Sequence, residues 1–220
     1  MTLRGMSPRV VALGAILLAG VPGAFAQTAS RISVGDDPSQ KEGSPALVLV
    51  ELSDFQCPYC GQAAREMLPQ VHEKFVRTGK VELIFVDLPL DMHPQASKAA
   101  EAAACAGDQK KFWEMHHHLF ANQRDLAPEK LPTYAQEVGL DIDAFQKCLA
   151  SGRHGAEIRQ DMNEAQDLRI SGTPAYLIGR RIPGGDEVEI LQTIRGLPPY
   201  SFLETRLNEL LTPEPKGSGR

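Results

Sequence analysis

The sequence lacks an excess of positive charge, an internal repeat and, beyond its first 26 residues, any apolar run long enough to cross a membrane. Lys and Arg number 23 against 28 Asp and Glu, so the 220-residue chain has a net charge of −5. This charge argues against nucleic acid or an anionic membrane surface as the partner. Cysteine is also scarce, with four residues in the whole chain. The remaining composition is that of an ordinary globular protein.

The N-terminal residues 1–26 have the pattern of a signal peptide. Arg4 and Arg9 come before an apolar stretch over 10–21, which is too short to span a bilayer, and Ala24-Phe25-Ala26 is a typical cleavage site. An uncleaved membrane anchor is the alternative interpretation. We expect an exported protein, periplasmic if the source has two membranes, in a compartment where disulfides persist.

Two of the four cysteines lie two residues apart in Cys57-Pro58-Tyr59-Cys60. An apolar run over 46–52 predicts a buried strand before them, and helical spacing over 61–76 predicts a helix after them. Pro58 suits a first helical turn, and the free N–H groups of a helix start favour a thiolate at Cys57. The alternative is half of a zinc site. A zinc site would need two more ligands close by, so we favour a redox pair.

The other two cysteines, Cys105 and Cys148, lie in separate predicted helices. The Cys57/Cys60 pair is too local to stabilise a fold, which leaves Cys105 to pair with Cys148 in a second, structural disulfide. Two buried free thiols are the alternative. Three histidines in a row, 116–118, point about 100° apart on a helix and cannot converge on one ion. We therefore expect no metal site and no cofactor.

The hydrophobic pattern predicts the element order β-α-β, then helices alone, then β-β-α. Residues 27–45 are expected to be a polar leader or a short edge strand, and 213–220 a disordered tail. A second strand over 81–86 completes a right-handed β-α-β unit with a parallel strand pair. Residues 91–169 give no strand signal and predict a helical insertion, with helices over 94–106, 109–121, 128–138, 141–149 and 157–168.

Strands return over 175–178 and 187–194, joined by a turn, and a helix over 199–211 closes the predicted fold. This order resembles the thioredoxin fold, and the insertion makes the chain similar to the exported DsbA-type thiol–disulfide oxidoreductases. The resemblance covers about residues 46–212. It rests on the motifs Phe55 to Cys60, Ser171-Gly172-Thr173-Pro174, and the insertion with its segments 104–106 and 111–116. It implies a thioredoxin-like domain over 46–90 and 170–212, interrupted by the insertion over 91–169.

The resemblance also implies roles for individual residues. Cys57 is the expected nucleophile and Cys60 its resolving partner, with Pro58 and Tyr59 completing the motif. Thr173 and Pro174 would form the cis-proline turn that binds an extended client peptide, although a proline at the start of a strand is common without that role. Glu51 would be a buried carboxylate that assists proton transfer at Cys60. The alternative is a carboxylate facing solvent at a strand end.

By this resemblance the protein oxidises unfolded or partly folded clients that carry cysteines, and a DsbB-like membrane protein recharges it. Tyr59 leaves a second hypothesis open, a reductase or isomerase kept reduced by a membrane electron donor. Such isomerases carry an N-terminal dimerisation domain, which the leader is too short to supply, so we expect a monomer. A client-binding chaperone with an incidental disulfide is a third hypothesis.

Overall fold

The computed structural model describes residue 1 and residues 30–212 of the chain. The predicted signal peptide, apart from Met1, and the predicted C-terminal tail lie outside the described residues. Among the helices that are described, none is both long enough and apolar enough to pass through a lipid bilayer.

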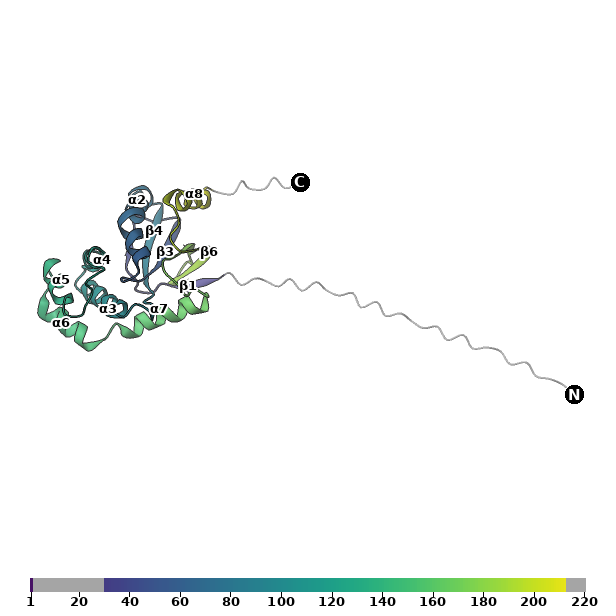
Figure 1. Cartoon of the computed structure of the whole chain (residues 1–220). Coiled ribbons are helices and arrows are strands. Elements are labelled where there is room, and N and C mark those ends of the chain that lie inside the picture. The colour runs from purple at the N-terminus through teal and green to yellow at the C-terminus, as the bar shows by residue number, and fades with distance from the viewer. Residues whose placement is uncertain (2–29, 213–220) are drawn as a thin grey trace.

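A six-stranded mixed sheet forms the centre of the molecule (Figure 1), with strand order β1-β6-β5-β3-β4-β2. Strand β3 lies between β4, which runs parallel to it, and β5, which runs antiparallel. The helical run that follows β3 returns the chain to the end of the sheet where β3 begins, which is why β3 and β4 are parallel. The strands are β1 (Arg31–Ser33), β2 (Ser39–Gln40), β3 (Leu47–Ser53), β4 (Val81–Asp87), β5 (Ala175–Arg181) and β6 (Glu187–Arg195).

The two short strands β1 and β2 come from the segment that the sequence describes as a leader or a short edge strand. Each pairs with one outer strand of the sheet, β1 with β6 and β2 with β4. Strand β5 extends three residues beyond its predicted end at Ile178. Its hydrophobic pattern stops at Gly179, but its pairing with β6 continues through a bulge to Arg181. A Cβ at Gly179 would lie 2.4 Å from the Glu189 carbonyl oxygen, so only glycine fits there.

The helical run after β3 starts at Pro58, which the sequence places in the first helical turn, and continues to Val76, where the helical spacing predicted over 61–76 also ends. It alternates between α and π turns, as α1 (Pro58–Gln62), η1 (Ala63–Met67), α2 (Leu68–Val71) and η2 (His72–Val76). Pro69 lies in the middle of this run and cannot donate an i→i−4 hydrogen bond. The wider π turn just before it accommodates the missing donor.

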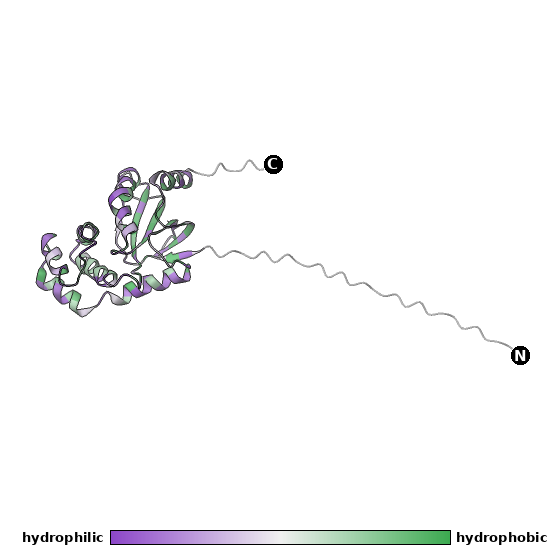
Figure 2. Ribbon diagram, in the orientation of Figure 1, coloured by the Kyte–Doolittle hydropathy of each residue, from purple (hydrophilic) through white to green (hydrophobic). Residues whose placement is uncertain are grey.

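The sheet is covered on both faces (Figure 1). The run from α1 to η2 and α8 (Tyr200–Leu211) pack on one face, where Phe75 and Leu207 meet strand residues such as Leu49. Helix α7 (Gly155–Asp167) covers the other face through Ala165. The strands are therefore coloured green for hydrophobic side chains in Figure 2, whereas the outer helices alternate between purple and green.

The helical insertion lies beside the sheet and has a core of its own. It contains α3 (Ala96–Gly107), α4 (Phe112–Ala121), α5 (Leu131–Glu137) and α6 (Ile142–Ser151), followed by α7. The prediction of a thioredoxin fold with a helical insertion is confirmed. Helix α7 belongs to the insertion by its place in the sequence but packs on the sheet, so the insertion and the sheet share one of their layers.

Candidate functional site

The Cys57-Pro58-Tyr59-Cys60 motif lies where β3 passes into α1. Cys57 is the N-cap residue of α1, with extended backbone angles, and its carbonyl accepts the first helical hydrogen bond from Gly61 N at 3.1 Å. Its own N–H donates to the side chain and the carbonyl of Asp54, at 3.1 Å and 3.0 Å. The sulfur of Cys57 is therefore held at a helix start, where backbone N–H groups have no partner within the helix.

The Cys57 thiol has a lowered pKa, about 5 against an ordinary value of 9.0. The largest cause is a hydrogen bond from the Cys60 thiol, and the backbone N–H groups of Cys60 and Tyr59 add to it, while burial acts in the opposite direction. Only 4% of Cys57 is exposed, and its Sγ lies 3.4 Å from the Thr173 carbonyl oxygen. Pro58 and Tyr59 are the exposed members of the motif, and 62% of the surface of Tyr59 is accessible.

The Cys60 thiol has the opposite character. It is fully buried, and burial is the largest cause of its raised pKa, followed by its hydrogen bond to Cys57 and the charge of Glu51. The two sulfurs of one motif are therefore unequal. Near neutral pH, Cys57 is a thiolate and Cys60 a thiol.

Glu51 lies in the middle of β3 and is 1% exposed. The solvent-facing alternative for this residue is thus wrong. Burial raises its pKa to about 8, although a hydrogen bond from the Ser53 hydroxyl at 3.1 Å acts in the opposite direction. Next to it in the sheet lies Tyr176 of β5, whose buried hydroxyl has no hydrogen-bond partner among the described residues. Burial, with the charges of Glu51 and Cys60, raises the pKa of Tyr176.

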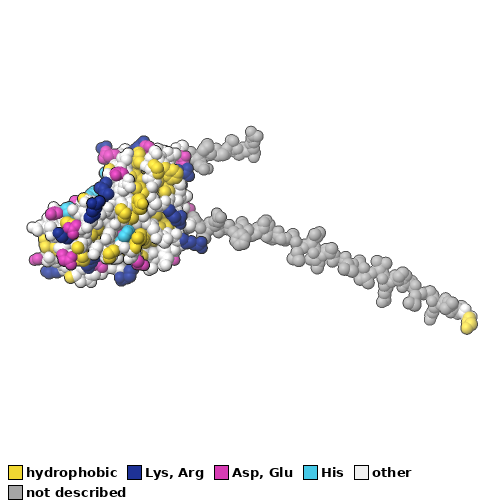
Figure 3. Space-filling view, in the orientation of Figure 1, with side chains coloured by type: hydrophobic (Ala, Val, Ile, Leu, Met, Phe, Trp, Pro, Cys, Tyr) yellow, Lys and Arg dark blue, Asp and Glu magenta, His cyan; other side chains and the backbone are white. Residues whose placement is uncertain are grey.

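The Thr173–Pro174 peptide bond is cis, and it places the Thr173 carbonyl against Cys57. The turn also forms one wall of a groove of about 470 Å³, which Tyr59 and the loop residues Leu197 to Pro199 line on the other sides. The groove has mostly apolar walls. Figure 3 shows apolar side chains gathered in a band on the visible face of the molecule, over α8, β4 and β3.

Asp54 is a site residue whose part the sequence pattern does not reveal, because it predicts only a loop position. The side chain of Asp54 is completely buried. Its Oδ1 accepts hydrogen bonds from the N–H groups of Gln56 and Cys57, at 2.7 Å and 3.1 Å. Its Oδ2 accepts one from Leu90 N at 2.8 Å and lies 2.7 Å from His93 Nδ1. Asp54 therefore ties the active-site turn to the loop that follows β4. Asp side chains in turns commonly accept a hydrogen bond from the backbone N–H two residues on, and this tendency is the signal that could have indicated it.

Gln123, which follows α4, is a second residue that the pattern misses. Its amide nitrogen donates to the carbonyls of Phe55 and Cys57, at 2.9 Å and 2.8 Å, so the insertion holds the motif directly. A Cβ at Gly61 would lie 1.8 Å from Gln123 Oε1, which explains the glycine after Cys60. No local signal points to Gln123, because its partners lie more than 60 residues away.

Cys105 and Cys148 form a disulfide between α3 and α6. Their sulfurs are therefore bonded to each other and are not ligands of a metal ion held by Cys57 and Cys60, which argues against the zinc alternative. The histidine run does not converge either. His116 is buried among aromatic rings, with centroids 5.0 Å from Phe85 and 4.8 Å from Phe120, and its two nitrogens have no hydrogen-bond partner in the described part of the chain. His118 instead lies with its Nε2 2.8 Å from Oε2 of Glu137.

A comparison with known protein families shows to which family the chain belongs. Residues 42–193 match the family described as thioredoxin. The chain belongs to the thioredoxin family. The fold of this thioredoxin-family protein is similar to the crystal structure of alpha-DsbA1 of Wolbachia pipientis, with a TM-score of 0.70, 21% identity, and coverage of 80% of this chain and 91% of that one.

Two curated relatives differ in how much of their length the thioredoxin-family chain spans. The probable disulfide bond formation protein D of Bacillus anthracis is 28% identical over 160 residues, which are 66% of this chain and 70% of the relative. The Na(+)/H(+) antiporter NhaA 3 of Salinispora tropica is 44% identical over 147 residues, which are 66% of this chain but 22% of the antiporter. The chain thus spans about a fifth of the length of that antiporter.

Proposed function

We propose that this protein is an exported thiol–disulfide oxidoreductase that transfers the Cys57–Cys60 disulfide to client proteins. The observation that carries the proposal is the inequality of the two sulfurs, with Cys57 at a helix start and its pKa lowered to about 5, and Cys60 buried with a raised pKa. A stable Cys57 thiolate is a good leaving group and favours the reduced enzyme, which makes the oxidised enzyme a stronger oxidant. The likeness to disulfide bond formation protein D supports the same direction.

The reaction takes two exchange steps. A client thiolate attacks Sγ of Cys57, the Cys57–Cys60 bond breaks, and Cys60 leaves with the electron pair and takes up a proton. A second client thiolate then attacks the client sulfur of the mixed disulfide, and Cys57 leaves as a thiolate. The client gains one disulfide and loses two electrons, which the two enzyme cysteines hold.

Glu51 is the proposed proton-transfer group for Cys60. In its ionised form, Glu51 is one cause of the raised pKa of the Cys60 thiol, which supports a coupling between the carboxyl and the sulfur. With a pKa raised to about 8 by burial, the carboxyl is protonated in most molecules at neutral pH and has a proton to give to Cys60 as that sulfur leaves. Glu51→Gln should therefore slow the first exchange step, in which a client thiolate attacks Cys57 and Cys60 leaves, and leave the second step, in which Cys57 leaves, nearly unchanged.

The groove beside Thr173 and Pro174 is the proposed client-binding site. It lies next to Cys57, and the exposed ring of Tyr59 forms its rim. The Thr173 peptide groups can pair with an extended client segment, as an added strand does at a sheet edge. Clients would be unfolded or partly folded proteins with free cysteines. The partner that recharges the enzyme would be a DsbB-like membrane protein.

Equilibration of the Cys57/Cys60 pair with glutathione tests the direction. An oxidant should have a potential near about −120 mV, whereas a value near about −270 mV would support the reductase alternative. The companion assay is oxidative refolding of a reduced, cysteine-containing client.

Cys57→Ala should abolish the refolding activity and thereby separate the enzyme from a chaperone, which would keep its effect without the sulfur. The control is Cys105→Ala/Cys148→Ala, which removes two sulfurs elsewhere but leaves the motif intact, with its fold checked by circular dichroism. Full activity of Cys57→Ala would refute the proposed function.

A further inference from the structure

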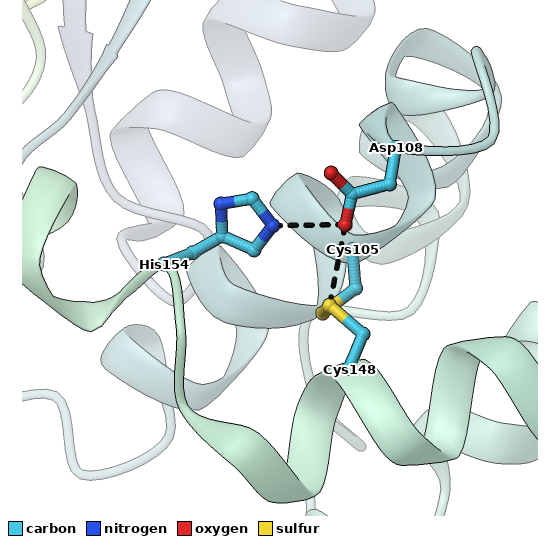
Figure 4. A group of neighbouring side chains, drawn as sticks. All are labelled: Cys105, Asp108, Cys148 and His154. Atoms are coloured by element: carbon cyan, nitrogen blue, oxygen red, sulfur yellow. Dashed lines mark hydrogen bonds and ion pairs between the residues drawn. A yellow bond between two sulfur atoms is a disulfide. The ribbon is translucent and has the colours of Figure 1, made fainter.

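Four potential metal ligands meet in the helical insertion, at some distance in the sequence from the redox motif (Figure 4). Cys105 comes from α3, Asp108 follows the end of that helix, Cys148 comes from α6, and His154 precedes α7. One ligand atom from each of the four lies within 4.8 Å of the other three. Figure 4 shows the carboxylate of Asp108 between the imidazole of His154 and the sulfur of Cys148.

The orientation of His154 is that of a metal ligand with a supporting carboxylate. Its Nε2 points into the group and lies 2.9 Å from Asp108 Oδ2, while its Nδ1 faces Glu157 Oε2 at 3.4 Å. Histidines that bind metals commonly donate their second N–H to a carboxylate, which fixes the ring and its tautomer. Glu157 is placed for that role.

The charges in the group suit a divalent cation once the sulfurs are thiolates. Two thiolates and the Asp108 carboxylate carry three negative charges, so Zn²⁺ leaves a net charge of −1. Arg153 forms an ion pair with Asp108 and supplies the compensating positive charge.

A cation has an open route to this group. Asp108 and His154 line a cavity of about 500 Å³ whose other walls carry Asp37, Glu157 and Asp161. The supply route and the ligands are therefore adjacent.

We propose that reduction of the Cys105–Cys148 disulfide converts this group into a tetrahedral zinc site with Cys105, Cys148, His154 and Asp108 as its ligands. A dithiol reductant gives two electrons and two protons to the disulfide and is itself oxidised to a disulfide. Zinc then displaces the two thiol protons. Two sulfurs bound to one tetrahedral zinc ion lie about 3.8 Å apart, as the Zn–S bond length and the tetrahedral angle require. Rotation of the two cysteine side chains permits this separation at their Cα–Cα distance of 5.9 Å.

The consequence is that a metal replaces the disulfide as the link between α3 and α6. Under oxidising conditions the disulfide holds the two helices, and under reducing conditions the ion does. The melting temperature of the reduced protein should therefore rise when Zn²⁺ is added, while that of the oxidised protein should not change.

Cobalt(II) is a direct probe of the site, because tetrahedral thiolate ligation gives sulfur-to-metal charge-transfer bands and strong visible d–d bands. The protein is prepared in a Cys57→Ala/Cys60→Ala background, so that one dithiol remains, and it is reduced and checked by circular dichroism. One equivalent of Co²⁺ should give these bands, and one equivalent of Zn²⁺ should remove them. The oxidised protein should give none.

Ligand variants separate the four-ligand site from simple chelation by two thiols. His154→Ala and Asp108→Asn should each weaken Co²⁺ binding at least about tenfold, and Glu157→Gln by about tenfold through the ring of His154. His72→Ala, which removes an exposed histidine elsewhere, should leave the affinity unchanged. Three results would overturn the proposal: no thiolate bands after reduction, bands that His154→Ala does not weaken, or loss of helical structure in the reduced protein both with and without metal.

Discussion

Glu51 provides the sharpest test of how burial controls this site, because burial is the largest influence on the pKa of its carboxyl. Its pKa is raised from the ordinary 4.5 to about 8, since the folded protein disfavours the charged form. A raised folded-state pKa gives a contribution to stability that is complete below pH 4.5 and is lost as the pH rises through 8. Glu51→Gln cannot ionise, so this loss disappears in the variant.

The expected size follows from the shift. Each pKa unit corresponds to about 1.4 kcal/mol, so ionising Glu51 completely costs the folded state about 5 kcal/mol. Relative to low pH, the parent protein should lose about 3 kcal/mol of its free energy of unfolding at pH 7 and about 1 kcal/mol at pH 5. Both losses are smaller than the full cost because most folded molecules keep the Glu51 proton at these pH values. Relative to the parent protein, the free energy of unfolding of Glu51→Gln should therefore rise by about 2 kcal/mol between pH 5 and pH 7.

The assay is guanidinium unfolding at several pH values between 5 and 9, with both proteins in a Cys57→Ala background so that the thiolate does not titrate. Glu82→Gln is the matched control, because Glu82 is also 1% exposed in a central strand but pairs with Arg181 at 2.8 Å. Burial raises the pKa of Glu82, but its hydrogen bonds from Arg181 and Lys41 outweigh burial and lower it. Its stabilisation is present above pH 4.5 and lost only as the pH falls below that value, so between pH 5 and pH 9 the difference between Glu82→Gln and its parent should stay nearly constant. A difference between Glu51→Gln and its parent that stays constant with pH would refute the reasoning.

Three further outcomes are expected. Thiolate absorbance at 240 nm should report a midpoint near 5 for Cys57, and Cys60→Ala should raise that midpoint because the Cys60 thiol is the largest cause of the lowered pKa; an unchanged midpoint contradicts this cause. Cys105→Ala/Cys148→Ala should lower the free energy of unfolding by about 4 kcal/mol, since the disulfide closes a loop with a sequence separation of 43; a loss below about 1 kcal/mol in denaturant unfolding speaks against the chain-entropy account. His116→Phe should stabilise the protein by about 1–3 kcal/mol at neutral pH by removing two buried nitrogens that have no hydrogen-bond partner within residues 30–212. Burial holds the pKa of His116 well below its usual 6.5, so the parent should lose further stability below that pH while the variant does not, as thermal unfolding at pH 5 and pH 7 can measure.

The sequence by itself determined the parts of this protein that depend on neighbours along the chain. The apolar run before Cys57 predicts a buried strand, and the spacing after Cys60 predicts a helix, because both patterns repeat within a few residues. Errors are confined to ends. The end of β5 at Arg181 lies outside the hydrophobic pattern and depends on pairing with β6. The family motifs add Thr173 and Pro174, which no periodicity would have selected.

Only the tertiary structure decided which of these segments meet. Cys57 contacts the Thr173 carbonyl across 116 residues, and Gln123 reaches the Cys57 carbonyl across 66. In the sequence, Asp54 looks like an ordinary loop residue and Tyr176 like an ordinary strand residue. In the fold, the buried Asp54 carboxylate accepts several hydrogen bonds, whereas the buried Tyr176 hydroxyl has no partner among the described residues. The physical reason is that pKa values and ligand sets depend on desolvation and on atoms a few ångströms away. Both are set by how the layers pack, and a linear pattern carries no record of that packing.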